Sequence, residues 1–391
     1  MAAPGDKPYR VYRGGRAKGN VPLSGDRGKT ESSRGGDGRP RKRRRRTWKR
    51  LLLVLVPLLI LVLVLWGLAG YVSVSRGVNA AHGRLAAGTT SALVAQSGLV
   101  LDSPTNILLL GTDHSSNGQP GRSSDNHSDS MMLLRTDPSR HRLVYVSIPR
   151  DLRATIPGYG DQKINAAMQI GGPKLAIQTV DALLGPKLPI NHVVVVDFGA
   201  FEKLIDAVGG INVNVPENIL SNRFDCPYST ATRCQQWPGW RFHKGVQHMT
   251  GHQALIYSRV RENQLNPADS DITRGEHQQA VMQATLSKLA SIHTFFKLPL
   301  DGSTLLAPIA TDLSTWDFMQ LGWVKFRVGT TLHCRLGGTS SDIGGGSYII
   351  GTEENFAVVQ EVLGLAAPQP PSPGGGAYAP GCVTGNQSLG N

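Results

Sequence analysis

The chain has 391 residues, 40% of them hydrophobic, and it carries 41 Lys and Arg against 28 Asp and Glu, a formal net charge of +13. This length allows one large domain or two small ones with tails. The excess charge is confined to one end, because residues 1–50 hold 17 basic and 4 acidic side chains, which leaves 24 of each for residues 51–391. A domain with a basic nucleic-acid-binding surface is therefore not required, and no nucleic acid is expected as a partner.

An uncharged apolar segment follows the basic tail. Eight Lys and Arg lie between Arg41 and Arg50, and the next charged residue is Arg76. A helix needs about 20 apolar residues to cross a bilayer, more than the roughly 7–15 of a signal-peptide core. We therefore predict a single-pass transmembrane signal anchor over residues 51–75, with a buried helix of a soluble protein as the alternative. Because Lys and Arg stay inside, the N-terminus is predicted to be cytoplasmic and the rest extracellular.

Composition divides the whole chain into five regions. The basic tail is rich in Gly, Arg, Ser and Pro and is expected to be disordered. The stretch after the anchor consists of small residues, and the chain ends in a stretch rich in Pro and Gly. We predict a cytoplasmic tail at 1–50, the anchor at 51–75, a stalk at 76–100, a folded extracellular domain at 101–365 and a flexible tail at 366–391.

Strands and helices alternate within the folded domain, which predicts an α/β fold with a mixed central sheet flanked by helices. The turn at 137–140 makes the second and third strands a hairpin. Residues 217–245 are expected to be irregular, and 302–365 to add short helices and a strand around 347–350. In chain order, strands are expected over 107–110, 131–135, 143–148, 193–197 and 211–215, and helices over 174–184, 200–208, 251–259 and 273–291.

All four cysteines lie on the predicted outer side of the membrane, where disulfides form. They are Cys226, Cys234, Cys334 and Cys382. Four cysteines allow three pairings, and the sequence does not choose among them. A zinc site is disfavoured because no CxxC spacing occurs.

Charged residues gather where the apolar strands are predicted to end. Asp113 follows the first strand, Asp129 precedes the second, and Arg150 and Asp151 follow the third. Ligands of α/β sheets commonly bind at strand ends. Two carboxylates can hold a divalent cation and arginines can hold phosphate oxygens, so Asp113 and Asp129 are candidate metal ligands. The alternative is ordinary turn aspartates and surface arginines.

A second charged cluster surrounds the start of the helix predicted over 273–291. Arg259 and Arg261 come before it, and Arg274 and Gln278 share one of its faces at the spacing i, i+4. Asp271 would lie at the helix N-terminus, which also favours anions. Three arginines at one helix start predict a polyanionic ligand.

Eight short motifs follow one another over roughly residues 104–295. They are Asn106-Ile-Leu-Leu-Leu-Gly-Thr-Asp113, Ser128-Asp-Ser-Met-Met-Leu133, Ser147-Ile-Pro-Arg-Asp151, Lys163-Ile-Asn-Ala-Ala167 with Gly171-Gly172, Val208-Gly-Gly-Ile211, Gly251-His-Gln-Ala-Leu255, Tyr257-Ser-Arg-Val-Arg261 and Asp271-Ile-Thr-Arg274. Each motif is weak alone, but the ordered series is specific. In this order the motifs resemble the LytR–CpsA–Psr family of cell-wall glycopolymer ligases.

The resemblance implies a membrane-anchored phosphotransferase of Gram-positive bacteria. It would move a teichoic acid, arabinogalactan or capsule polymer from an undecaprenyl-diphosphate carrier to a peptidoglycan sugar hydroxyl, with Mg²⁺ or Mn²⁺. The partners would be the polyprenyl-diphosphate-linked glycopolymer, peptidoglycan and the cytoplasmic membrane. The family's metal ligands match Asp113 and Asp129. Its remaining site residues match Arg150, Lys163, Arg259, Arg261, Asp271, Arg274 and Gln278.

Two departures from the family pattern concern positive charge. The chain has His127 where the family usually has Arg, with Arg122 as the candidate substitute, and His277 where the family often has Arg. Protonated histidine would restore a charge at these positions. Either Asp151 or Asp271 could serve as general base.

The polyprenyl chain of such a substrate would need an apolar tunnel between sheet and helices. Candidate lining residues are Met168, Ile170, Ile177, Val180 and Leu184, with core packing as the alternative. Two other functions remain open: a non-catalytic polyprenyl-phosphate-binding regulator, and a pyrophosphatase in which water replaces the sugar hydroxyl.

Overall fold

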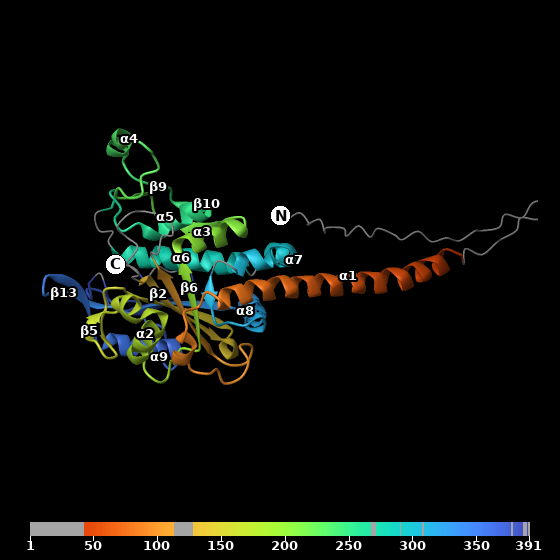
Figure 1. The fold of residues 1–391 in the computed structure, drawn as a ribbon, viewed down its shortest axis with the longest axis horizontal. Coiled ribbons are helices and arrows are strands. Elements are labelled where there is room, and N and C mark those ends of the chain that lie inside the picture. Colours follow the sequence, from red (N-terminus) through yellow and green to blue (C-terminus); the bar gives the residue numbers. More distant parts are fainter. Residues whose placement is uncertain are drawn as a thin grey trace, which may run out of the picture. The chain divides into compact units, whose positions relative to one another are not determined.

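A seven-stranded mixed sheet forms the centre of the computed structural model, which describes residues 43–112, 128–266, 271–289, 291–306, 309–376, 378–385 and 389. The strand order is β11-β6-β1-β2-β3-β12-β15. Figure 1 shows helices on both sides of this sheet. The predicted fold class is confirmed. The strands are β1 (Thr105–Thr112), β2 (Ser128–Asp137), β3 (Arg142–Ile148), β6 (His192–Asp197), β11 (Ala310–Thr311), β12 (Thr330–Arg335) and β15 (Gly381–Thr384).

Strand pairing makes the sheet mixed. β2 pairs antiparallel with both β1 and β3, and β2 and β3 form the predicted hairpin around the 3₁₀ turn η2 (Pro138–Arg140). β6 pairs parallel with β1, and β12 pairs parallel with β3. As a result β1 and β6 both end, and β2 begins, at the same edge of the sheet.

Helices cover both faces of this sheet. α2 and α9 pack on one face, and α6 and α8 contribute to the core on the other. α3, α5 and α7 build a further core with the antiparallel pair of β7 (Ile211–Val215) and β10 (Gly245–Met249). Their bounds are α2 (Ala166–Leu184), α3 (Phe198–Ala207), α5 (Gly251–Arg259), α6 (Asp271–Leu289), α7 (Ile292–Leu306), α8 (Thr315–Arg327) and α9 (Glu354–Leu363).

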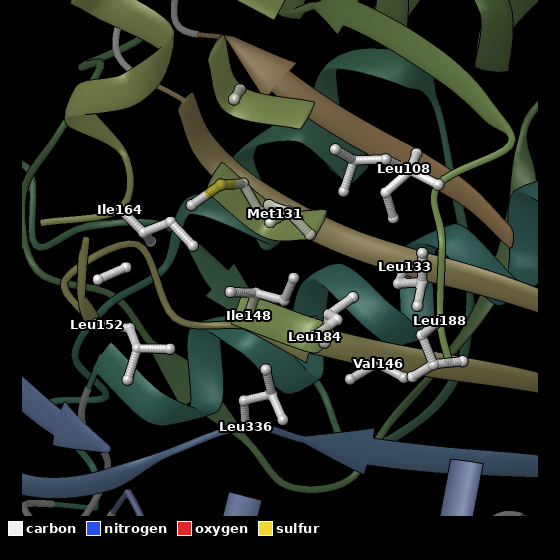
Figure 2. Close-up of a cluster of buried hydrophobic side chains, with 14 of the residues drawn as sticks. Leu108, Met131, Leu133, Val146, Ile148, Leu152, Ile164, Leu184, Leu188 and Leu336 are labelled. Carbon is white, nitrogen blue, oxygen red and sulfur yellow. The ribbon is translucent and has the colours of Figure 1, made fainter. Parts of the chain in front are cut away.

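The apolar run of β2 follows from this double burial. Successive strand residues point to opposite faces, so Met131 and Leu133 join the core under α2 and α9 (Figure 2). Met132 and Leu134 join the core on the opposite face. In a sequence, a strand that is buried on both faces appears as a continuous run of apolar residues rather than as alternating apolar and polar residues.

Short elements complete the fold. The additional two-stranded sheets and the short helices lie outside the central sheet. They are β4 (Arg153–Ile156) with β5 (Gly160–Lys163), β7 (Ile211–Val215) with β10 (Gly245–Met249), β8 (Ile219–Leu220) with β9 (Arg241–Phe242), β13 (Gly338–Ile343) with β14 (Gly346–Gly351), η1 (Thr89–Ala92) and α4 (Ala231–Gln236).

Helix α2 begins earlier than predicted. It is interrupted at Gly171 and Gly172, whose backbone angles are not helical, and Pro173 then starts its second half. Proline is favoured at a first helical position. The prediction that began at Lys174 therefore captured the second half of α2 and missed its first turns.

Helix α1 (Arg43–His82) contains the apolar segment, and its last turns belong to the folded domain. Residues 51–82 are long and apolar enough to cross a membrane. Val78 and Ala81 are nevertheless buried in the core that contains α7. A side-chain carbon at Gly77 would lie 2.9 Å from the Gly302 carbonyl oxygen, so these helices cross in close contact. The prediction of a separate stalk over 76–100 is wrong, since this segment packs on the domain.

The C-terminal tail is tied to the sheet. β15 pairs antiparallel with β12, Cys382 stands opposite Cys334, and the two form a disulfide. The second disulfide joins Cys226 and Cys234. The prediction of a flexible tail over 366–391 is wrong for β15, which forms an edge of the central sheet.

We predict that the Cys334–Cys382 disulfide stabilises the protein more than the Cys226–Cys234 disulfide. The Cys334–Cys382 disulfide closes a loop of 48 residues, and the Cys226–Cys234 disulfide closes a loop of 8 residues. Loop-closure entropy gives about 4 and about 2.5 kcal/mol. The double variant Cys334→Ala/Cys382→Ala should therefore lower the free energy of unfolding by about 1.5 kcal/mol more than Cys226→Ala/Cys234→Ala. Denaturant unfolding without reductant measures both, and equal losses would contradict the prediction.

Candidate active site

A large apolar cavity lies between the central sheet and the helices on one of its faces. Its volume is about 1050 Å³, at the upper end of the roughly 300–1,000 Å³ usual for ligand pockets. β1, β2 and β6 form its floor, and α6, α7 and α8 contribute walls. Lining residues from these elements include Ile107, Leu109, Met132, Leu134, Val194, Met282, Leu286, Leu305, Phe318 and Leu321.

Helix α6 runs along the cavity and gives it two different ends. Arg274 and Gln278 line the cavity near the start of α6, and Val281, Thr285 and Leu289 line it farther along. At about 1.5 Å per residue, Arg274 and Leu289 are roughly 22 Å apart along the helix axis. The cavity therefore has a charged end and a long apolar part.

Arginines from two helices meet at the charged end. Arg259 and Arg261 lie at and just after the end of α5, and both line the cavity together with Arg274. Arg274 is 7% exposed. The amide of Gln278 donates to the carbonyl of Ser258 at 3.4 Å, which joins α6 to α5. These four predicted residues therefore line the same cavity, and their roles in binding stay predictions.

Helix α5 is positioned by its caps. Thr250 forms a capping box with Gln253, so the helix begins at Gly251 as predicted. Val260 leaves the helical conformation. Gly251 also approaches the Glu202 carbonyl closely, where a Cβ would clash. These contacts seat α5 on α3 and fix where Arg259 lies.

A loop of the irregular segment reaches the charged end, and the sequence did not predict this. Asp225 forms an ion pair with the Arg259 guanidinium. The guanidinium also lies 5.6 Å from the centre of the Phe224 ring. Asn222 and Phe224 line the cavity. In the sequence, the signal for this contact was an aspartate directly after an aromatic residue, Phe224-Asp225. Nothing near it in the chain indicated that it would pair with Arg259.

The end of β6 places a carboxylate, that of Asp197, beside this end of the cavity. Thr112 is in register with both Ser128 of β2 and Asp197 of β6. Asp197 lines the cavity and accepts a hydrogen bond from the Ala200 amide at 2.6 Å, which caps α3. Ser130, next to Asp129, lines the cavity too. Oxygen ligands at such an edge suit Mg²⁺ or Mn²⁺.

The structure does not describe the side chains of several predicted site residues. Asp113 and Arg122 lie outside the described residues, as do the side chains of Asp129 and Asp271. The backbone places Asp129 in β2 and Asp271 at the start of α6. Their roles as metal ligands, substrate ligand and candidate base stay predictions.

Arg150 and Lys163 surround Asp151 instead of lining the cavity. The Arg150 guanidinium lies 3.3 Å and the Lys163 ammonium 2.7 Å from the Asp151 carboxylate. Burial alone would raise the pKa of Asp151, but the hydrogen bond from Lys163 and the Arg150 charge outweigh it and lower the pKa. A carboxylate with a lowered pKa is a weak general base, which disfavours Asp151 in that role.

The predicted tunnel residues lie on the wrong face of the sheet. Met168, Ile177, Val180 and Leu184 are buried in the core that α2 forms with β1, β2 and β3, and Ile170 packs against it. The cavity opens on the opposite face, under α6 and α8. The core-packing alternative is therefore confirmed for these five residues.

His277 does not replace an arginine charge. It is 4% exposed and its ring packs 4.3 Å from that of Tyr257. Burial lowers its pKa to about 4, although the Val260 carbonyl opposes this shift by accepting a hydrogen bond. His277 is therefore neutral near pH 7, and the expectation that it supplies positive charge is wrong.

We predict that His277 makes the protein less stable as the pH falls from about 6.5 to about 4. Its folded pKa lies below the ordinary value, so the unfolded chain takes up the proton first and is favoured in this range. The loss amounts to about 3 kcal/mol. His277→Gln should flatten the pH dependence of the unfolding free energy, whereas a substitution of the exposed His243 should not. An unchanged slope in His277→Gln would contradict the burial argument.

A family model, described as the LytR_cpsA_psr family, matches residues 68–362. The match covers the central sheet except β15, the cavity, and the helices α5 and α6. The chain belongs to this family. The resemblance inferred from the motifs is thereby confirmed.

Individual relatives agree with the family match. The regulatory protein MsrR of Staphylococcus aureus is 31% identical over 56% of this chain and 60% of its own length. The polyisoprenyl-teichoic acid–peptidoglycan teichoic acid transferase TagU of Bacillus mycoides is 34% identical over 61% of this chain and 68% of its own. The match thus spans about two thirds or less of these relatives.

A solved structure supports the fold. TagT, a B. subtilis protein, bound to LI-WTA matches at a TM-score of 0.53 and 25% identity. The match covers 72% of this chain and 98% of TagT. The likeness therefore extends over nearly all of that protein's domain.

Proposed function

We propose that this protein is a membrane-anchored transferase that moves a cell-wall glycopolymer from a polyprenyl-diphosphate carrier to a peptidoglycan hydroxyl. The observation that carries the proposal is a single cavity with arginines at one end and apolar walls along the rest of α6. A polyprenyl diphosphate has the same division into a charged head and a long apolar chain. The names of TagU and of the LI-WTA-bound TagT support this class of substrate.

In this proposal the charged end of the cavity binds the diphosphate. Arg259, Arg261 and Arg274 offer guanidinium groups, which bind phosphate oxygens in a bidentate manner. Burial of Arg274 strengthens such a contact because the surroundings screen charge less than water does. The polyprenyl chain then follows α6 toward Leu289 between apolar side chains.

The reaction is an in-line displacement at phosphorus. The acceptor hydroxyl attacks the phosphorus nearer the glycopolymer, its oxygen forms the new phosphoester bond, and the bond to the bridging oxygen breaks. Polyprenyl phosphate leaves with the bonding electron pair, and the hydroxyl proton passes to a base. Such a step requires positioning and charge neutralisation, which arginines supply. Asp271 is the remaining candidate base.

We propose that a divalent cation binds at the same end of the cavity, with Asp113 and Asp129 as ligands of Mg²⁺ or Mn²⁺. Asp197 is in register with Thr112, the residue before Asp113. When bound, the cation would neutralise charge on the diphosphate. Arg150 and Lys163, held together by Asp151, would extend the positive surface toward the glycopolymer side.

Loss of one arginine should slow the transfer. Arg259→Ala or Arg274→Ala should each reduce turnover of a lipid-diphosphate-linked oligosaccharide with peptidoglycan fragments by at least about tenfold. Arg153→Ala is the matched control, because Arg153 is an exposed arginine that pairs with Asp161 away from the cavity. Detection of the phosphodiester-linked product by mass spectrometry is the measurement. The ligase proposal fails if the unchanged protein yields no such product with any divalent metal.

The same assay separates the two alternatives. Release of phosphate-terminated glycopolymer without transfer would indicate a pyrophosphatase. Binding of the lipid with neither product would indicate a regulator, which is the role that the name of MsrR states for that protein.

We further propose that the N-terminal tail is cytoplasmic and the domain extracellular. Protease added outside intact cells should cleave the domain and spare residues 1–50. An epitope tag at each end, detected by immunoblotting, measures this. Loss of the N-terminal tag in intact cells would reverse the orientation.

A further inference from the structure

Helix α8 exposes a continuous apolar face, which we call the α8 face. It consists of Trp316, Met319, Trp323 and Phe326, which are 54%, 50%, 54% and 75% exposed. Their spacing of three, four and three residues places them on one side of the helix. The opposite side of α8 is buried through residues such as Val324. This exposure is a property of one helix face and not of scattered residues.

Such a face is unusual on a surface that contacts only water. Contiguous exposed apolar patches mark interaction sites. Tryptophan in particular favours the boundary between a bilayer and water, where its ring is apolar and its N–H remains hydrated. A helix with aromatic residues on one side and polar residues on another is typical of helices that lie in a membrane surface.

The α8 face is also the rim of the cavity. Met319, Trp323 and Phe326 are exposed, and the same residues line the cavity. The cavity therefore opens to the outside along α8. The arginines lie at the other end of α6, so this opening belongs to the apolar part.

The membrane anchor enters the domain beside α7, and its last residue lies near the start of α8. In the α1 residues 59–82, Leu68 and Tyr71 are exposed, and the hydroxyl of Ser73 then accepts a hydrogen bond from the Ser303 amide at 3.2 Å. His82 lies 2.9 Å from the carbonyl of Leu313, two residues before α8 begins. The end of the apolar run and the start of α8 are thus joined through the last turns of α1 (Figure 1).

Charge beside the α8 face complements phospholipid head groups. Lys325 and Arg327 lie in the last turn of α8; Arg327 is exposed, whereas Lys325 is half-buried and lines the cavity beside Phe326. The nearby acidic residue Asp317 is engaged in the capping box with Ser314. Basic side chains flanking an aromatic face favour lipid phosphates.

We propose that the α8 face docks on the surface of the phospholipid bilayer into which α1 inserts, so that the cavity opens directly into lipid. This rests on the proposed membrane anchor. With its head group at the arginines, the bound lipid would extend its polyprenyl chain through the apolar part of the cavity and past Trp323 and Phe326 into the bilayer without crossing water.

Depth-dependent fluorescence quenching tests the docking. The full chain is placed in phospholipid nanodiscs, one copy per disc, with a single cysteine carrying an environment-sensitive dye. All four native cysteines are in disulfides, so the introduced thiol is the only reactive one. Trp316→Cys is the test position because Trp316 is exposed but does not line the cavity. Val246→Cys, 72% exposed on β10, is the control.

Lipid-borne spin labels near the head groups should quench the dye at 316 at least about twofold more than the dye at 246, because an interfacial helix lies about 5–10 Å deep. Phe326→Cys should give the same result if Trp316→Cys fails to fold. Equal quenching at 316 and 246 overturns the proposal. A dye at 316 that is shielded from water but not quenched indicates a protein partner and also overturns it. Since no substrate is present, failure of the transferase assay leaves this result unaffected.

Discussion

Burial of both faces of the central sheet is the constraint on which the rest of the structure depends. On the face of α2 and α9, apolar side chains such as Leu108, Leu133 and Leu184 form a buried core (Figure 2). On the face of α6 and α8, the apolar side chains of the strands instead surround about 1050 Å³ of open cavity. The first face holds the sheet together, and this leaves the second free to take an apolar ligand.

Positive charge in the folded part of the chain is also concentrated at one edge of the central sheet. The net charge of residues 51–391 is zero, yet arginines gather where β1 and β6 end and α6 begins. Parallel strands end at the same edge, so Thr112 and Asp197 stand side by side while α5 and α6 bring Arg259 and Arg274 to that edge. The topology thus concentrates a local field that no sum over the sequence reveals.

Sequence patterns predicted those helices and strands whose bounds are set by residues close to them in the chain. β7 has the predicted bounds because its residues alternate, and α5 has them because Thr250 and Gln253 cap it. β12 and β15 were missed, because their burial comes from β3 and from the Cys334–Cys382 disulfide. Arg274 and Gln278 were predicted together from helical spacing. The tunnel was assigned to the wrong face, since α2 and α6 are both apolar and only the packing shows which face stays hollow.

The continuity of α1 has a mechanical consequence. From Leu59 to Ala81 the helix passes from exposed apolar residues into the core, where Gly77 and Gly302 cross in contact. In the proposed function, a rigid junction of this kind would hold the reaction centre at a constant height above the hydrocarbon, unlike a flexible tether. Only acceptor glycans within that short vertical reach would then be modified, which would select strands close to the membrane over the outer layers of the wall.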